Sequence, residues 1–547
     1  MAKKQAAPAA REWWRGAVIY QIYPRSYQDT TGDGSGDLRG ITRRLPHIAS
    51  IGADAIWISP FFKSPMADMG YDVSDYCDVD PMFGTLEDFD ALIAEAHRLG
   101  LKVIIDQVLS HSSDQHPWFA ESRKSRKNPK ADWYVWADPK PDGSPPNNWL
   151  SIFGGPAWEW DSVRRQYYLH NFLASQPDLN FHNPKVQKAL LDTVEFWLKR
   201  GVDGFRLDTV NFYFHNASLK DNPPFQEDMS AFTHANPYEY QYHLYDKTQP
   251  DNLAFLKKLR ALLDRYGDRC TVGEVGDIGE RSLKIVADYT SGGDKLNMCY
   301  TFDLLGPQFS PKHFADCITH FETAVSDGWV CWAFSNHDVT RHVSRWTSPQ
   351  GSTDRVAKLS AALLVSLRGS ICMYQGDELG LEEADIAFED LRDPYGIRFW
   401  PGFKGRDGCR TPMPWEADKK NAGFTKGTPW LPVPPAHAEM AVSAQQRDKD
   451  SVLAAYRQMV AFRKAHPALV EGDIEVLEAA RDVLALLRTS GSERILCLFN
   501  LSEKNAKWKL PTQLGKAEVL PALDLGATVD GRNASLPALS SLFLKVS

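Results

Sequence analysis

The feature that most constrains the fold of this chain is a regular alternation of strand-like and helix-like segments between about residues 18 and 375. Short apolar runs rich in β-branched and aromatic residues are separated by longer stretches with the periodicity of an amphipathic helix. We assign strands to AVIYQIYP (17–24), GADAIWISP (52–60), LKVIID (101–106), VDGFRLDT (202–209), CTVGE (270–274), LNMCYTFDL (296–304), WVCWAFSN (329–336) and SICMYQG (370–376). Such repeated strand–helix units predict an α/β fold of the (β/α)8 TIM-barrel type.

Two of the intervening segments carry clear helix-boundary signals. In TLEDFDALIAEAHRLG, Thr85 and Asp88 have the spacing of a capping box, and apolar residues recur on one face. In NPKVQKALLDTVEFWLKRG, Asn183 is a suitable N-cap and Pro184 suits the first helical turn. Each segment ends in glycine and is followed directly by a predicted strand, as a strand–helix repeat requires.

Two parts of the chain depart from this repeat. Residues 107–178 are too long for one helix and are rich in Pro, Asn, Asp and Trp, which indicates an inserted small domain after the third strand. After about residue 470, short alternating strands replace the helical pattern. We therefore predict a barrel, an inserted domain B and a C-terminal β-sandwich domain, with the bounds 1–106 plus 179–470, 107–178 and 471–547.

Composition and charge exclude several classes of function. The chain has 547 residues and a net charge of −8, whereas nucleic-acid-binding proteins present basic surfaces. It lacks an apolar run of about 18 residues and an apolar N-terminal signal segment, so we expect no membrane partner and no secretion. The eight cysteines are scattered without a CxxC pair, which favours reduced thiols and a cytoplasmic location. We expect a monomer or a homodimer.

A charged pair lies inside one of the predicted strands. In GFRLDTVNF, Arg206 and Asp208 are two residues apart, so on a strand both side chains point to the same face. Burying such charges in the interior of a barrel is unfavourable by several kcal/mol unless they are paired. Either the two residues only brace each other, or a functional site uses them.

Acidic residues stand at the ends of several predicted strands. Asp106 ends the third strand, Asp208 the fourth and Glu274 the fifth, and Asp338 follows the seventh. Active sites of (β/α)8 barrels lie at the C-terminal ends of the strands, so the four carboxylates are expected to converge on one mouth. Carboxylates crowded together raise one another's pKa values. Such crowding is unfavourable for packing alone and occurs where paired carboxylates do acid–base work. The combination predicts a catalytic site.

These residues carry a resemblance to a known family. DQVLSHSS, GFRLDTVNF, TVGEV and FSNHD resemble the four short barrel motifs of the α-amylase family of glycoside hydrolases. QPDLN, IYQIYPRSY, GYDVSDY and GRDGCRTPMPW resemble motifs of that family's α-glucosidase and oligo-1,6-glucosidase branch. The resemblance extends over nearly the whole chain and implies an enzyme that acts on small α-glucosides.

By this resemblance, three carboxylates are catalytic. Asp208 corresponds to the nucleophile that forms a covalent glucosyl-enzyme, and Glu274 to the general acid that later acts as the base. Retaining pairs of this kind lie roughly 5–5.5 Å apart. Asp338 corresponds to the third acid, which stabilises the oxocarbenium-like transition state, and Arg206 would hold Asp208 ionised and oriented.

The resemblance also implies substrate-binding residues. His111 and His337 correspond to histidines that hydrogen-bond the glucose in the cleaved subsite, although a histidine taken alone is more often structural. Asp68 and Arg406 correspond to a pair that closes the pocket over the terminal glucose, the alternative being a surface ion pair worth at most about 1 kcal/mol. Tyr71 corresponds to the aromatic platform under that ring. A closed pocket implies attack from the non-reducing end.

Three further residues bear on specificity. Thr209 directly follows the nucleophile position, where relatives that cleave α-1,6 links tend to carry Val, so it favours maltose-like substrates. The alternative is a strand-end hydroxyl that bonds locally. Phe153 and Phe172, in the inserted domain, are candidates for the wall of the neighbouring subsite or for plain core.

The segment DTTGDGSGDLRG spaces oxygen-bearing residues at every second position, like the start of a calcium loop. The twelfth position is Gly40, so the bidentate Glu of an EF-hand is lacking, and spacing alone favours a surface turn. The resemblance implies a divalent-ion loop here, although the branch usually carries Asn at position 31, and Ser110 replaces an Asn that binds a different calcium in many α-amylases. We expect structural Ca²⁺ or Mg²⁺ and no organic cofactor. The expected ligands are Asp29, Thr31, Asp33, Ser35 (through its carbonyl) and Asp37.

The expected function is that of a retaining, exo-acting α-glucosidase that releases glucose from maltose-like substrates, with sucrose as a further candidate. The alternative is an α-glucosyltransferase or sugar isomerase in which an acceptor sugar outcompetes water at the same residues. A non-catalytic binding protein, like the transporter-associated relatives of the family, would have a transmembrane helix and lack the acids that this chain carries.

Overall fold

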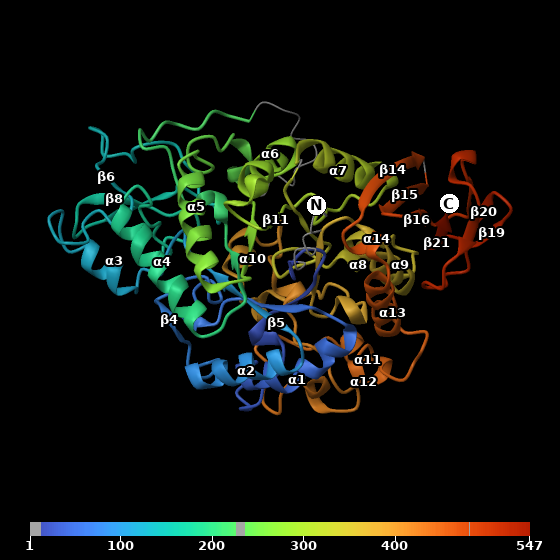
Figure 1. Ribbon diagram of the computed structural model, residues 1–547. Coiled ribbons are helices and arrows are strands. Elements are labelled where there is room, and N and C mark those ends of the chain that lie inside the picture. Colours follow the sequence, from blue (N-terminus) through green and yellow to red (C-terminus); the bar gives the residue numbers. More distant parts are fainter. Residues whose placement is uncertain (1–11, 226–235, 326, 481) are drawn as a thin grey trace, which may run out of the picture.

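The computed structural model describes residues 12–225, 236–325, 327–480 and 482–547 (Figure 1). At its centre lies an eight-stranded parallel sheet with the order β11-β10-β9-β5-β2-β1-β13-β12. The strands are β1 Val18–Ile22, β2 Ala55–Ile58, β5 Lys102–Gln107, β9 Gly204–Leu207, β10 Cys270–Glu274, β11 Met298–Tyr300, β12 Cys331–Ala333 and β13 Ser370–Tyr374. Seven of them lie within their predicted runs, and β5 extends one residue beyond its run, to Gln107.

The sheet closes on itself. Its two outer strands, β11 and β12, meet through a parallel bridge between Cys299 and Val330, where the backbone N–H of Cys299 donates to the carbonyl of Trp329. Taken in order around the barrel, the strands follow their order in the sequence, as in a (β/α)8 barrel. The predicted fold class is confirmed.

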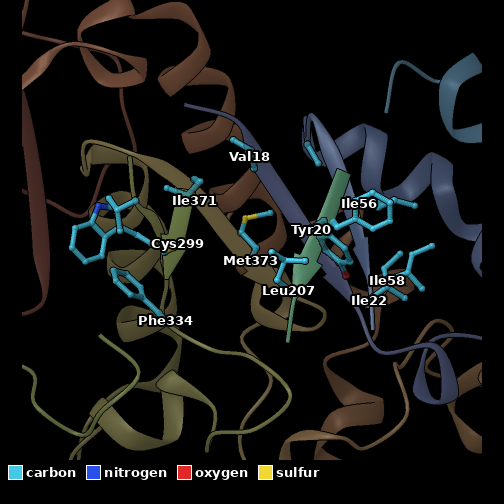
Figure 2. Packing of buried hydrophobic residues seen from close by; sticks show 14 of the residues in the cluster. Val18, Tyr20, Ile22, Ile56, Ile58, Leu207, Cys299, Phe334, Ile371 and Met373 are labelled. Carbon is cyan, nitrogen blue, oxygen red and sulfur yellow. The ribbon is translucent and has the colours of Figure 1, made fainter. Parts of the chain in front are cut away.

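Side chains alternate between the two faces of the barrel strands. On β1, Val18, Tyr20 and Ile22 point toward the surrounding helices, and Figure 2 shows them packed beside Ile56 and Met373 from the neighbouring strands. The intervening residues fill the barrel interior. This inner group comprises Ile19, Trp57, Ile104, Cys270, Val272, Met298, Tyr300, Cys331 and Cys372.

Arg206 belongs to the inner face of β9. In the strand register it lies beside Asp106 of β5 on one side and Val272 of β10 on the other, and Val272 is part of the inner group. A charged side chain is therefore present in an interior that is otherwise largely apolar and aromatic. The parity of the strand, set by its sequence, aims both Arg206 and Asp208 at the barrel axis.

Helices surround the sheet (Figure 1). The predicted capping box is present at the start of α2, between Thr85 and Asp88, and Asn183 caps α4 by accepting a hydrogen bond from the N–H of Lys185. The longer helices are α1 Leu38–Ile51, α2 Leu86–Arg98, α4 Pro184–Lys199, α5 Asn252–Leu263, α6 Gly279–Thr290, α7 Pro311–Ala324, α9 Thr353–Ser366 and α13 Val452–Ala465. In the part of the chain that the structure describes, no helix combines the length and the apolar character needed to cross a bilayer.

Two smaller sets of strands lie on opposite sides of the barrel in Figure 1. Within the predicted insertion, helix α3 (Pro117–Ser122) accompanies a sheet of β6 (Trp136–Ala137), β8 (Gln166–Leu169) and β7 (Trp158–Asp161). The C-terminal part is all-β, as predicted, whereas the exact domain bounds stay a prediction. Its sheets have the orders β14-β15-β16-β21-β18 and β17-β20-β19, from β14 (Asp473–Ala480), β15 (Val483–Ser490), β16 (Glu493–Asn500), β17 (Ala506–Lys509), β18 (Ala517–Val519), β19 (Thr528–Asp530), β20 (Asn533–Leu536) and β21 (Ser540–Val546).

Candidate active site

One guanidinium group connects three carboxylates at the mouth of the barrel. Nη1 of Arg206 lies 2.8 Å from Oδ1 of Asp106 and 2.6 Å from Oδ1 of Asp208, and Nη2 lies 2.7 Å from Oε2 of Glu274. All four side chains are almost completely buried. Asp208 and Glu274 therefore bind adjacent nitrogens of one guanidinium group, which brings both carboxylates to the same part of the barrel mouth.

Neighbouring groups orient these carboxylates. Tyr300 accepts a hydrogen bond from Nη2 of Arg206 at 2.9 Å and donates its own hydroxyl to Oε1 of Glu274 at 3.0 Å. The backbone N–H of Thr209 donates to Oε2 of Glu274 at 2.9 Å. Thr209 has φ 39° and ψ 50°, a left-handed conformation that is unusual for a β-branched residue and turns this N–H toward the acid. Backbone strain of this kind is concentrated at functional sites.

Burial and charge shift the protonation equilibria of the carboxylates. Burial raises the pKa of Glu274 to about 7, opposed by Arg206 and assisted by the charge of Asp208. Burial likewise raises the pKa of Asp208, against the opposing effect of Arg206, and raises the pKa of Asp106 to about 6. A carboxyl group that stays protonated near neutral pH can serve as a general acid.

Asp338 lies in an opposite electrostatic setting. Its Oδ1 is 2.8 Å from Nη2 of Arg410 and 3.2 Å from Nη1 of Arg406, and its Oδ2 is 3.2 Å from Nε2 of His337. Burial acts to raise its pKa, but His337 and the two arginines together hold that pKa below its ordinary value. Asp338 therefore stays ionised, whereas burial lowers the pKa of His337 to about 3 and keeps that ring neutral.

The two predicted histidines and Tyr71 lie together on one wall. The ring of Tyr71 stacks on that of His337, with centroids 5.4 Å apart, and its hydroxyl lies 3.2 Å from Oδ2 of Asp106. Nε2 of His111 lies 3.1 Å from the carbonyl oxygen of Tyr71 and 3.1 Å from Nε2 of Gln176. Burial lowers the pKa of His111 to about 4, so both histidines are neutral hydrogen-bonding groups near neutral pH.

The predicted Asp68–Arg406 pair is formed, and a third residue supports it. Nη2 of Arg406 lies 2.9 Å from Oδ1 of Asp68. Asp393 binds the same guanidinium with both carboxylate oxygens, at 2.7 Å from Nη2 and 3.0 Å from Nε, while Gln176 donates to Oδ2 of Asp68 at 3.0 Å. Asp68 is 3% exposed and Asp393 is fully buried, which excludes a simple surface ion pair. Arg406 also contacts Asp338, so this closure is joined to the carboxylates.

These groups surround a cavity of about 250 Å³. Most of the predicted site residues line it or contact a residue that does; Phe153 and Phe172 both lie in its wall. The lining residues are Asp68, Tyr71, His111, Ile152, Phe153, Phe172, Asp208, Thr209, Phe212, Tyr238, Lys247, Glu274, Gly276, Phe302, Asp338, Tyr395 and Arg406. The wall of the cavity thus combines charged side chains with apolar and aromatic ones.

The predicted metal loop lies apart from this cavity. Oδ1 of Asp29 accepts the N–H groups of Thr31 and Gly32, and Oδ2 of Asp37 accepts that of Thr30 at 2.7 Å. Asp33 accepts the N–H of Ser35 at 2.9 Å. Oδ1 of Asp33 accepts this one hydrogen bond and keeps a lone pair for a cation, whereas Oδ1 of Asp29 already accepts two N–H groups. The described residues bring no three His, Cys, Asp or Glu side chains together as a metal site. The five ligands thus stay a prediction.

Sequence patterns did not identify several residues of the site. Tyr300 stands at the end of β11, and a polar residue at a strand end was the available signal. Arg410 lies four positions after Arg406 in the same glycine-rich motif, so a second arginine there could have been considered. Asp393 and Lys247 lie in irregular segments, and the sequence around them carries no comparable signal.

Comparison with known proteins places this geometry in context. A family model described as the alpha amylase catalytic domain matches residues 21–472. A probable alpha-glucosidase of Rhizobium meliloti (strain 1021) is 60% identical over 98% of this chain and 98% of its own length. An oligo-1,6-glucosidase of Heyndrickxia coagulans is 39% identical over 91% of this chain and 94% of its own length.

A solved structure gives the same result at the level of the fold. The alpha-glucosyl transfer enzyme XgtA superposes with a TM-score of 0.94 and 54% identity, over 98% of this chain and 100% of that chain. Because the match covers nearly all of both chains, it includes the barrel, the insertion and the C-terminal sheets.

Proposed function

Because this chain belongs to the α-amylase family and is a glycoside hydrolase, we propose that it is a retaining, exo-acting α-glucosidase that releases glucose from the non-reducing end of short α-glucosides. The observation that carries the proposal is the arrangement around Arg206, which binds Asp208 and Glu274 through adjacent nitrogens. Binding to adjacent nitrogens of one guanidinium supports the closely spaced pair of a retaining enzyme, roughly 5–5.5 Å apart, over the wider pair of an inverting enzyme.

In the first step an oxygen of Asp208 attacks the anomeric carbon of the terminal glucose. The bond between that carbon and the glycosidic oxygen breaks as Glu274 transfers its proton to the leaving oxygen. The raised pKa of Glu274, about 7, supplies a protonated acid at neutral pH. Asp338, held ionised by its cationic neighbours, stabilises the positive charge that develops on the ring.

In the second step Glu274, now a carboxylate, takes a proton from water. The water oxygen attacks the anomeric carbon, the bond to Asp208 breaks, and glucose leaves with the anomeric configuration of the substrate. The enzyme returns to its starting protonation state. Through both steps Tyr300 and the N–H of Thr209 hold Glu274 in place.

Exo action is supported by the closed end of the cavity. The cluster of Asp68, Arg406 and Asp393 blocks the space beyond the glucose and offers hydrogen-bonding groups to its hydroxyls. A hydroxyl-binding wall of this kind rejects a chain that continues past the terminal unit, because the continuing sugar would displace these contacts. Thr209, next to the nucleophile, supports a preference for maltose-like linkages, and sucrose remains a further candidate.

Product analysis tests this proposal. The purified protein is incubated with maltose, isomaltose, sucrose and trehalose in turn and the released glucose is measured, while the anomer of the single glucose freed from p-nitrophenyl α-glucoside is followed by NMR. We expect glucose mainly from maltose, and α-glucose from the aryl glucoside. Release of β-glucose first would overturn the retaining mechanism, and internal cleavage of longer maltooligosaccharides would overturn exo action.

A second function, α-glucosyl transfer or sugar isomerisation, uses the same residues. Similarity to the alpha-glucosyl transfer enzyme XgtA favours it. In this reaction an acceptor hydroxyl gives its proton to Glu274 and attacks the glucosyl-enzyme in place of water. Larger or rearranged sugars that dominate the products from the start of the incubation would assign this activity instead of hydrolysis.

We also propose that the loop between Asp29 and Asp37 binds a structural Ca²⁺ or Mg²⁺, and that the protein acts in the cytoplasm. The oxygen-bearing residues at alternate positions support ion binding by this loop, and the eight free cysteines support a reducing compartment. EDTA should lower the melting temperature before it affects turnover, because an ion that binds only the folded state stabilises it. An unchanged melting temperature, together with no metal by elemental analysis, would contradict the ion.

A further inference from the structure

A lysine outside the predicted site lies in the wall of the catalytic cavity. Lys247 stands in the irregular segment before α5 and is 5% exposed. Its Nζ donates to the carbonyl oxygen of Gly276 at 2.6 Å and lies 4.8 Å from the ring centroid of Phe212. The carboxylate of Asp277 is 3.7 Å from Nζ, which is an ion pair too long for a hydrogen bond.

Among the described residues, the ammonium group makes one strong hydrogen bond, one long ion pair and contacts with the rings of Phe212 and Tyr238, whose centroids are 4.8 and 5.8 Å from Nζ. An ammonium has three N–H donors, so these partners leave donors of a buried charge without an oxygen acceptor. Burial lowers the pKa of Lys247, as expected for such a setting. A lysine that served only to brace the loop at Gly276 would gain nothing from facing a cavity, yet Lys247 lines one.

The position of Lys247 relative to the acid identifies its side of the cavity. Gly276 follows Glu274 by two residues, so the ammonium group lies at the end of the strand that carries the acid. Glu274 must lie next to the leaving oxygen. Lys247 is therefore on the side where the leaving sugar departs, and the Asp68–Arg406 closure belongs to the catalytic end.

In the described part of the chain, the other polar groups on that side include the hydroxyl of Tyr238, which lines the cavity and has no hydrogen-bond partner. The hydroxyl of Thr209 lies 3.3 Å from Asp208 and 3.1 Å from Ser110, and the hydroxyl of Tyr395 accepts from Asn236 at 2.9 Å. The remaining wall is largely apolar or aromatic. Beyond it lies a second cavity of about 740 Å³ whose wall also includes Lys247.

We propose that Lys247 is a specificity-determining residue that donates a hydrogen bond to a hydroxyl of the sugar unit on the leaving-group side. The same contact holds an acceptor sugar during transfer, since the acceptor occupies the place of the leaving group. The aromatic wall packs on the ring of that sugar, and the hydrogen bond from Lys247 discriminates between sugars by the position of their hydroxyls. This inference rests on the proposed α-glucosidase function.

The experiment compares two substrates with poor leaving groups. Maltose has a leaving sugar with hydroxyls, whereas methyl α-glucoside has none on its leaving group. In Lys247→Met we expect kcat/KM for maltose to fall by roughly tenfold or more, as for loss of a charged hydrogen bond, with methyl α-glucoside little changed. Equal loss on both substrates would mean that the variant disturbs Glu274 through Gly276, and no loss on maltose would mean no contact; either result overturns the inference.

A matched control and a second measurement complete the test. Lys257→Met removes an exposed lysine of α5 and should leave both substrates unaffected. Maltose analogues that lack single hydroxyls in the reducing-end unit should include one that wild-type enzyme hydrolyses roughly tenfold less well, a result that needs no variant to fold. If every analogue is hydrolysed as well as maltose, Lys247 does not bind a hydroxyl of the leaving sugar. A wild-type protein inactive on every α-glucoside would instead reject the proposed function, and the inference with it.

Discussion

Arg206 carries one positive charge into a region that holds three carboxyl groups, and this imbalance explains the electrostatics of the site. Asp106, Asp208 and Glu274 all contact the same guanidinium, so it cannot fully compensate all three at once. Burial then keeps at least one of them protonated near neutral pH. The Arg206–Asp208 pair is thus part of a larger buried charge network, in which the protonation of each carboxyl group depends on that of the others.

Substitution of the nucleophile tests its assignment. Asp208→Asn keeps the shape of the side chain but removes the attacking carboxylate, so we expect kcat to fall by roughly 10⁴-fold or more on every α-glucoside. Circular dichroism and the melting curve should stay close to those of the wild type. The exposed Asp192→Asn is the matched control. A residual rate within a hundredfold of the wild type would remove Asp208 from this role.

The dependence of activity on pH follows from the acid. Burial raises the pKa of Glu274 to about 7, and the reaction needs its protonated form, so kcat/KM for maltose should fall as the pH rises above about 7. It should also fall toward acid pH, as Asp208 takes up a proton. Because Asp208 and Glu274 are coupled through Arg206, the apparent pKa values of the two limbs belong to the pair of carboxyl groups and not to either residue alone.

An aryl glucoside provides the control for this profile. p-Nitrophenolate leaves without needing a proton, so the alkaline limb should be weaker with p-nitrophenyl α-glucoside than with maltose. Alkaline limbs of equal depth for both substrates would contradict the role of Glu274 as the acid.

At the scale of elements, local signals positioned the parts of the site. Strand parity placed Arg206 and Asp208 on the inner face of β9, and caps and glycines bounded the helices that flank it. Local signals did not predict the left-handed conformation of Thr209, which turns its N–H toward Glu274. A β-branched residue rarely adopts this conformation, so only the surrounding packing can impose it.

The cap of α4 provides a test at this scale. Asn183 accepts the N–H of Lys185 at 2.9 Å, at the start of the helix that leads into β9. Asn183→Ala should lower the free energy of unfolding by about 1 kcal/mol, because an N–H at the helix start loses its partner. Urea unfolding measures this change. Asn183→Asp, which keeps a cap, is the control, and equal losses in the two variants would contradict a capping role.

At the scale of the whole molecule, buried arginines bind carbonyl oxygens of distant segments, and one of them joins the C-terminal sheets to the barrel. Arg488 of β15 is fully buried, and Nη1 donates to the carbonyl oxygen of Ser366, at the end of α9, at 2.7 Å. Its other donors reach the carbonyl oxygens of Leu469, Gly472 and Asp473. Within the barrel part, Arg463 of α13 binds the carbonyl oxygens of Gly16, Val365, Leu367 and Gly369. We infer that the two parts stabilise each other.

Removal of one of these arginines should therefore affect the whole fold. Arg488→Met leaves several buried carbonyl oxygens without donors, which should lower the free energy of unfolding by about 3 kcal/mol or more and shift the entire calorimetric transition downward. KM for maltose should not change, because Arg488 is remote from the cavity. Arg494→Met, on the neighbouring strand, is the control. A changed KM for maltose or an unshifted transition would contradict this account.

The sequence by itself determined the order of the elements, the inward direction of the strand-end carboxylates and, through the resemblance of its motifs, the family. These properties depend on periodicity, caps and short segments, in which the relevant residues are close along the chain. Tertiary structure decided which distant groups meet. Asp68 and Arg406 are 338 positions apart, and neither the support of Asp393 nor the place of Lys247 beside Gly276 has a local pattern. Such contacts arise where barrel closure brings irregular loops to one end of the sheet, and local periodicity does not encode that meeting.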